Sequence, residues 1–264
     1  MHGNGAENFM SKVLYILGLA MLLIPMGWRF LDGKEQEGKI ATYSRKVEYM
    51  DEEELVHQWK LAKQYNQRLY KEGKRDENTY ETQLDFLGNG MMGSVEIPKI
   101  DLKLPIYHGT EEAVLAAGVG HLKESSFPVG GENTHCVLTG HRGAPDAQLF
   151  TRLDEMEMGD LFFIHVCQKT LCYRVCEIQV VKPEEVGVIE IQKGEDLVSL
   201  ITCTPYGLNT HRLVVTGKRE MNNTVILQTE EGGMLSKWDQ VYLAIPCMFG
   251  TAIFLKQKRK GVSP

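Results

Sequence analysis

VSLITCTPYGLNTHRLVVTGKR, residues 198–219, contains two apolar, alternating runs that are separated by a short turn-rich segment. The runs 198–203 and 211–217 have the period of β-strands, and proline, glycine and asparagine are typical of the turn between them. A hairpin of this kind places a thiol, Cys203, at the end of one strand and a guanidinium, Arg212, at the start of the next. The stretch therefore predicts β-structure that carries a potential nucleophile beside a fixed positive charge.

The guanidinium of Arg212 beside the thiol of Cys203 could assist a nucleophilic reaction in two ways. A nearby guanidinium favours the thiolate over the thiol, and the thiolate is the nucleophilic form. The same guanidinium could bind the oxyanion that forms when sulfur attacks a carbonyl carbon. A buried structural cysteine is the alternative, because free cysteine is among the most buried residue types. These two residues alone leave both interpretations open.

A histidine in a glycine-rich loop is the second chemical feature. The sequence TGHRGAP, residues 139–145, follows a short apolar strand at 136–138. Histidine is the usual proton shuttle near neutral pH, and flanking glycines let the backbone approach another element closely. His141 is therefore a candidate acid and base. The alternative is a solvated loop histidine, since the chain has 8 histidines.

Several separated motifs, in this order along the chain, resemble those of sortases, and specifically of class C, the pilus-assembling sortases. They are GNGMMG with EIPKI at 88–100, GHL through PVGG at 120–131, TGHRG with LF at 139–150, and TCTPY through NTHRL at 202–213. The resemblance covers about residues 40–220. It implies that His141, Cys203 and Arg212 are the catalytic residues and that no cofactor or metal is needed.

The resemblance also implies a reaction. A class C sortase cleaves a Leu-Pro-x-Thr-Gly-like sorting signal between Thr and Gly, forms a thioacyl enzyme, and transfers the acyl group to a pilin lysine amine. The expected partners are pilins or surface proteins with a C-terminal sorting signal. The alternative within the family is a housekeeping sortase that attaches surface proteins to the cell wall.

Two alternatives lie outside this activity. A papain-like protease places its nucleophile before its histidine, whereas here His141 precedes Cys203. A membrane-tethered scaffolding domain without activity is the other alternative. The presence of all three motif residues argues against it.

The expected fold is mainly β: a sortase-like eight-stranded β-barrel with an N-terminal helical segment, flanked by two transmembrane helices. Alternation predicts strands at 94–97, 102–106, 161–166 and 171–181, in addition to the two strands around Cys203. Helical spacing predicts a helix over 40–73, with Asp51 as a possible N-cap, Glu54 at its third position, and an apolar stripe that packs on the domain. The stripe consists of Leu55, Trp59, Ala62 and Leu69.

The segment before the first barrel strand departs from the family pattern. Many pilus sortases carry a lid there with an Asp-Pro-aromatic motif, and residues 71–85 contain no Asp-Pro. The charged stretch 71–80 is predicted to be an exposed loop. A lid that fills the site is therefore not expected, and Cys203 should be accessible. A gate built from Asp76 and Tyr80 in another register is the alternative.

Both ends of the chain carry apolar segments, which define the expected domain boundaries. Residues 1–32 are predicted to be a cytoplasmic stub and signal-anchor helix, 33–87 the extracellular helix and lid-like loop, and 88–221 the catalytic barrel. A linker (222–237), a second transmembrane helix (238–256) and a basic cytoplasmic tail (257–264) follow. For the N-terminal apolar segment the alternative is a cleaved signal peptide. For the C-terminal apolar segment the alternative is an amphipathic or buried helix. The expected location is the cell membrane, multi-pass, with an extracellular catalytic domain.

Charge and cysteine content limit the remaining functions. The net charge is −6 and there is no basic stripe with aromatic residues, so nucleic acid is not an expected partner. No Cys-x-x-Cys pair is present, which argues against a metal cluster. A disulfide across a predicted hairpin loop, 168–171, is possible between Cys167 and Cys172. Otherwise the cysteines should fill the barrel; those considered are Cys136, Cys167, Cys172 and Cys176.

Overall fold

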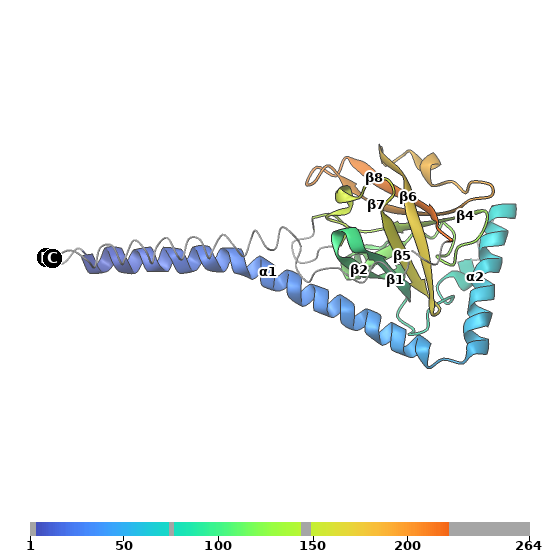
Figure 1. The fold of residues 1–264 in the computed structure, drawn as a ribbon, viewed down its shortest axis with the longest axis horizontal. Helices are drawn as coiled ribbons and strands as arrows, with labels where there is room; N and C mark the ends of the chain where they lie inside the picture. The colour runs from blue at the N-terminus through green and yellow to red at the C-terminus, as the bar shows by residue number, and fades with distance from the viewer. Residues whose placement is uncertain (1–3, 74–76, 144–148, 222–264) are drawn as a thin grey trace. The chain divides into compact units, whose positions relative to one another are not determined.

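Eight strands close into a single β-barrel in the computed structural model, which describes residues 4–73, 77–143 and 149–221 (Figure 1). Their order around the barrel is β1-β2-β3-β4-β7-β8-β6-β5. The strands are β1 (Met91–Ile97), β2 (Leu102–His108), β3 (Val119–His121), β4 (Thr134–Thr139), β5 (Leu161–Val166), β6 (Lys169–Val181), β7 (Asp196–Thr204) and β8 (His211–Arg219). The eight-stranded barrel expected from the sequence is confirmed.

Strand direction decides which loops share an edge of the barrel. β2 pairs with β3, and β4 with β7, in parallel, whereas β8 is antiparallel to β7. The ends of β4 and β7 and the start of β8 therefore meet at one edge. Short helical elements connect the strands: η1 (Pro98–Ile100), α4 (Glu112–Ala117), η2 (Leu153–Glu155) and η3 (Val186–Ile189).

Alternating side chains from β7, β8 and their neighbours fill the barrel. Val198 and Leu200 of β7 lie in one apolar core with Leu213 and Val215 of β8. Gly217 of β8 allows a close approach, because a Cβ there would lie 2.4 Å from the Phe162 ring. Core packing of this density leaves no room for an added methyl group.

Two long helices, α1 (Asn4–Glu48) and α2 (Glu52–Glu72), precede the barrel together with the one-turn helix α3 (Glu77–Tyr80), where the sequence predicted one helix over 40–73. The prediction of a single helix is wrong because Asp51 caps the start of a second helix. Its carboxylate accepts a hydrogen bond of 3.1 Å from the backbone N–H of Glu53. Glu54 instead accepts from Gln58, so the reciprocal cap is not made. Gly73, in the left-handed conformation with φ of 62°, ends α2.

The apolar face of α2 packs against the barrel, as the sequence predicted, and α2 runs beside the strands in Figure 1. Leu55, Ala62 and Leu69 are buried. The Asn66 side-chain amide holds α2 against the backbone of Phe127. It donates a hydrogen bond to the Phe127 carbonyl (3.1 Å) and accepts one from the Phe127 N–H (2.7 Å). The helix is therefore an integral wall of the domain.

Residues 28–48 of α1 belong to the same compact unit as the barrel, whereas residues 4–27 belong to another. The Tyr43 hydroxyl donates to the Met92 carbonyl, and Gln168 donates to the Val47 carbonyl. Among the described residues, no helix is both long enough and apolar enough to cross a membrane. The second predicted anchor, 238–256, lies outside the described residues together with its flanks, 222–237 and 257–264.

The β5–β6 hairpin turns at Cys167 and Gln168, whose φ angles are 48° and 60°. Two residues with positive φ are typical of a tight hairpin turn. The predicted loop at 168–171 is therefore wrong, because β6 already begins at Lys169. Cys172 lies opposite Phe163, and all five cysteines of the described residues are free, so the possible Cys167–Cys172 disulfide is not formed.

Candidate active site

Cys203 and Arg212 are directly opposite each other in the antiparallel pairing of β7 with β8. Residues that face each other across two strands point to the same side of the sheet. The preceding pair, Thr202 and Leu213, is buried toward the barrel interior. Cys203 and Arg212 therefore lie on the outer side, where both side chains are partly exposed. This is the juxtaposition that the hairpin sequence predicted.

His141 follows the end of β4 at the same edge. Thr139 pairs with Ile201 in the parallel register, and the N–H of Gly140 donates to the Ile201 carbonyl at 3.0 Å. The Thr202 hydroxyl donates back to the Gly140 carbonyl at 2.8 Å. These contacts hold the residue before His141 against the residue before Cys203. The histidine therefore leaves the sheet at the level of the thiol.

Gly140 is required by this close approach. A Cβ at this position would lie 2.8 Å from the ring of Phe150, which is fully buried. The flanking glycine of the sequence motif is therefore explained by packing against an aromatic ring. It brings the histidine loop close to the end of β7.

The imidazole of His141 contacts the carboxylate of Glu112 on α4. Nε2 lies 3.2 Å from Oε1 of Glu112. The His141 side chain is 32% exposed and that of Glu112 is 86% exposed. Sequence analysis missed Glu112, because no local pattern links α4 to the loop after β4.

Arg142, the residue after His141, was also given no role from the sequence. It donates to the Thr204 hydroxyl at 3.0 Å and pairs with the carboxylate of Asp154 on η2. Its side chain is 9% exposed. Arg142 therefore connects the histidine loop to the end of β7. The feature of the sequence that could have indicated this role is the position of the arginine directly after the motif histidine.

The guanidinium of Arg212 is held at the start of β8 by backbone carbonyls. Nη1 donates to the carbonyls of Asn209 (3.2 Å) and His211 (3.1 Å). A guanidinium has five N–H donors, so others can be directed at an oxyanion beside Cys203. His211 pairs with Thr204 instead of Cys203, and its ring contacts the Thr210 hydroxyl.

The other described cysteines have environments that disfavour the thiolate. Burial raises the pKa of Cys136 well above its usual value and that of Cys167 to about 12. The pKa values of Cys172 and Cys176 are also raised, mainly by desolvation. Within the described residues, no group of three or more His, Cys, Asp or Glu side chains is arranged to hold a metal ion.

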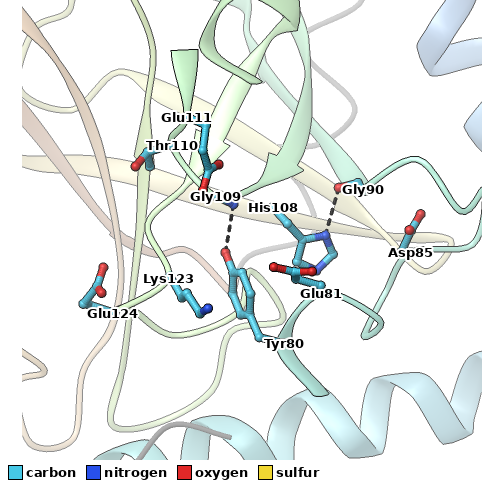
Figure 2. A pocket seen from close by; sticks show the side chains of 10 residues that line it. All are labelled: Tyr80, Glu81, Asp85, Gly90, His108, Gly109, Thr110, Glu111, Lys123 and Glu124. Carbon is cyan, nitrogen blue, oxygen red and sulfur yellow. Dashed lines mark hydrogen bonds between the residues drawn. The ribbon is translucent and has the colours of Figure 1, made fainter. Parts of the chain in front are cut away.

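The prediction of an exposed loop over residues 71–80 is wrong for the end of this segment. Tyr80, at the end of α3 (Glu77–Tyr80), is buried. Its hydroxyl lies 2.9 Å from Nδ1 of His121. The same hydroxyl accepts a 3.1 Å hydrogen bond from the Gly109 N–H, which Figure 2 shows. The aromatic ring stacks on Phe127. Burial among aromatic residues outweighs the charges that flank Tyr80 in the sequence, and Asp76 lies outside the described residues.

A cavity of about 470 Å³ lies beside Tyr80 (Figure 2). Its lining includes His108, Glu111 and Lys123, and it does not include His141, Cys203 or Arg212. The cavity is therefore a different place from the edge that carries the candidate catalytic residues.

Acid should weaken the domain through His121. Burial lowers the pKa of His121 to about 4, whereas an unfolded histidine titrates near 6.5. Between these values the unfolded chain binds more protons, so the free energy of unfolding falls as the pH falls from about 6.5 and levels off below about 4. The expected loss between pH 7 and pH 5 is on the order of 2 kcal/mol.

The measurement is the urea midpoint at pH 7 and at pH 5, in the wild type and in His121→Gln. Replacement should reduce the difference between the two midpoints, because the other titrating groups are shared. An unchanged pH dependence in the variant would contradict the assignment to His121.

Comparison with known proteins identifies the class. The sortase domain family model matches residues 95–220. Sortase A of Staphylococcus aureus is 30% identical over 216 residues, which cover 77% of this chain and 92% of that protein. The chain spans 63% and 61% of the length of two other curated sortases. The chain belongs to the sortase family of cysteine transpeptidases.

Solved structures give the nearer group, the class C sortases. Sortase C of Streptococcus pneumoniae, whose structure bears on pilin substrate specificity, is 44% identical with a TM-score of 0.64, covering 70% of this chain and 97% of that one. Sortase C of Clostridium perfringens, solved with the C-terminal cell wall sorting motif, is 41% identical with a TM-score of 0.62, covering 69% and 98%. This chain is therefore similar to class C sortases over its barrel.

Proposed function

We propose that this sortase assembles pili: it cleaves a Leu-Pro-x-Thr-Gly-like sorting signal between Thr and Gly and transfers the acyl group to a pilin lysine amine. The observation that carries the proposal is the pairing of Cys203 with Arg212 at the edge where His141 leaves β4. A nucleophile, an oxyanion donor and a proton carrier at one edge are what acyl transfer through a thioester requires. The similarity to sortases C that concern pilin substrates and a sorting motif supports the choice of substrate.

In the first half-reaction the Cys203 thiolate attacks the carbonyl carbon of the threonine. A carbon–sulfur bond forms, and Arg212 donates hydrogen bonds to the oxyanion. Protonated His141 then gives its proton to the nitrogen of the glycine as the carbon–nitrogen bond breaks. The leaving fragment departs with a free amine, and the substrate stays on the enzyme as a thioester.

In the second half-reaction an amine attacks the thioester. His141, now neutral, takes the proton of the attacking amine, and the thiolate of Cys203 leaves. The energy of the original amide bond is retained in the thioester, so transfer needs no external fuel and no cofactor. The loop at 205–210 is exposed, which supports access for an acceptor protein.

The amine that accepts the acyl group distinguishes the proposed pilus assembly from the function of a housekeeping sortase. Purified protein is incubated with a sorting-signal peptide, and either hydroxylamine, a pilin-derived lysine peptide or a glycine-type amine of the cell wall is added. We expect hydroxylamine to trap the acyl group and the lysine peptide to give an isopeptide product by mass spectrometry. Absence of a trapped product would contradict sortase activity. A product with the cell-wall amine alone would favour the housekeeping function.

We also propose that the catalytic barrel acts at the outer face of the cell membrane. The apolar runs at 13–28 and 241–255 and the basic cluster 256–260 support this arrangement. The location of the barrel outside the membrane is a prediction from the sequence.

A further inference from the structure

We propose that Glu112 is a positioning residue for His141, so that the candidate active site has a fourth member. The inference rests on the proposed function, because it assigns a task to the histidine of that site. It is carried by the contact of 3.2 Å between Nε2 of His141 and Oε1 of Glu112. The carboxylate comes from α4, an element that precedes β3 and contributes none of the three motif residues.

The contact decides which ring nitrogen faces the chemistry. A carboxylate only accepts hydrogen bonds, so Nε2 of His141 must carry the proton that it donates to Glu112. In the neutral ring the lone pair is then on Nδ1. Nδ1 is therefore the nitrogen that takes the proton of the acceptor amine and returns one to the leaving amine.

The charged groups around His141 come from three elements. Glu112 approaches from α4, Cys203 lies at the end of β7, and Arg212 lies at the start of β8. The next residue, Arg142, is turned toward Asp154. The carboxylate of Glu112 contacts the ring directly, and it stabilises the imidazolium that is present before the first half-reaction and forms again in the second.

The size of the effect follows from exposure. Glu112 is 86% exposed, and exposed ion pairs are strongly screened by solvent. Glu112→Ala should therefore slow the chemistry by about two- to fivefold, a much smaller loss than removal of a motif residue. The effect should shrink further at molar salt. Glu112→Gln keeps an oxygen that can accept from Nε2, so its rate should stay within about twofold of the wild type.

The neighbouring residue provides a matched control. Glu111 has the same side chain one position earlier, and its carboxylate folds back over Gly109 instead of reaching His141. Figure 2 shows Glu111 beside Gly109 in the lining of the separate cavity. Glu111→Ala removes one negative charge from the same surface, and it should leave the rate unchanged.

The test is a double-mutant cycle read at Cys203. The second-order rate constant for alkylation of Cys203 by iodoacetamide is measured for Glu112→Ala, Glu112→Gln and Glu111→Ala, each with His141 present and with His141→Ala. The rate of acyl-enzyme formation from a sorting-signal peptide is measured in the same proteins with His141 present, separating kcat from KM, and in the single variant His141→Ala. We expect Glu112→Ala to slow alkylation and lower kcat without changing KM, and to have no further effect on alkylation once His141 is absent.

Three outcomes overturn the inference. Equal rates for Glu112→Ala and Glu111→Ala would remove the special role of Glu112. A full Glu112→Ala effect in the His141→Ala background would show that Glu112 acts without the histidine. If His141→Ala itself left alkylation and acylation unchanged, the role of His141 in the proposed function would fail, and the inference with it. The first two outcomes leave the proposed function intact.

Discussion

Cys203→Ala is expected to abolish acyl-enzyme formation and pilin polymerisation while the fold persists. Sulfur is the atom that bonds to the substrate in the proposed mechanism, and a methyl group cannot replace it. Cys203 is partly exposed at the outer side of β7, so its truncation leaves no cavity in the barrel core. The loss of activity should therefore be complete without a comparable loss of stability.

The measurement is mass spectrometry of the enzyme after incubation with a sorting-signal peptide, together with the ladder of pilin polymers on a denaturing gel. Cys176→Ala is a matched control, because Cys176 on β6 is exposed, and the prediction that it fills the barrel is wrong. We expect the control to retain activity. A normal polymer ladder from Cys203→Ala would rule out Cys203 as the nucleophile.

Arg212→Lys is expected to lower the rate of acylation by about a hundredfold or more. Lysine keeps the positive charge but loses the planar set of donors that a guanidinium directs at an oxyanion. Loss of one oxyanion donor typically costs on the order of hundreds-fold in rate. The ammonium of lysine also cannot make the paired contacts of Nη1 with the carbonyls of Asn209 and His211 in the same geometry.

His211→Ala is the control for this experiment, since His211 is adjacent in sequence but pairs with Thr204 instead of Cys203. It should retain most of the activity. The quantity to compare is kcat for acyl-enzyme formation in single turnovers. Near wild-type turnover by Arg212→Lys would contradict an oxyanion role for Arg212.

The part of the site that could be predicted from the sequence is its local part. Cys203 and Arg212 are joined by one hairpin, so alternation and turn residues were enough to bring them together. The position of His141 relative to them depends on parallel pairing of β4 with β7, which spacing in the sequence does not encode. The resemblance to sortases provided that connection, and the contact with Glu112 could be seen only in three dimensions.

The wrong predictions have physical causes of the same kind. Asp51 was recognised as a cap, but the continuous helical spacing on both sides hid the break between α1 and α2. Tyr80 lies in a charged stretch and was assigned to an exposed loop, although its ring packs against Phe127 and its hydroxyl binds His121. Cys167 was placed just before the predicted hairpin loop at 168–171, although its positive φ angle puts it in the turn itself. In each case a tertiary contact or backbone conformation overrode the local pattern.

The parallel pairing of β4 with β7 has a consequence for biogenesis. β5 and β6 lie between these strands in the sequence, so the pairing closes a long chain loop and belongs to the slow, non-local steps of folding. The nucleophile and its arginine share a hairpin that can form early, whereas His141 joins them only when the barrel closes. A nascent or partly unfolded chain would therefore carry its thiol without its proton carrier. In the proposed mechanism, transpeptidation would therefore begin only after the whole barrel is complete.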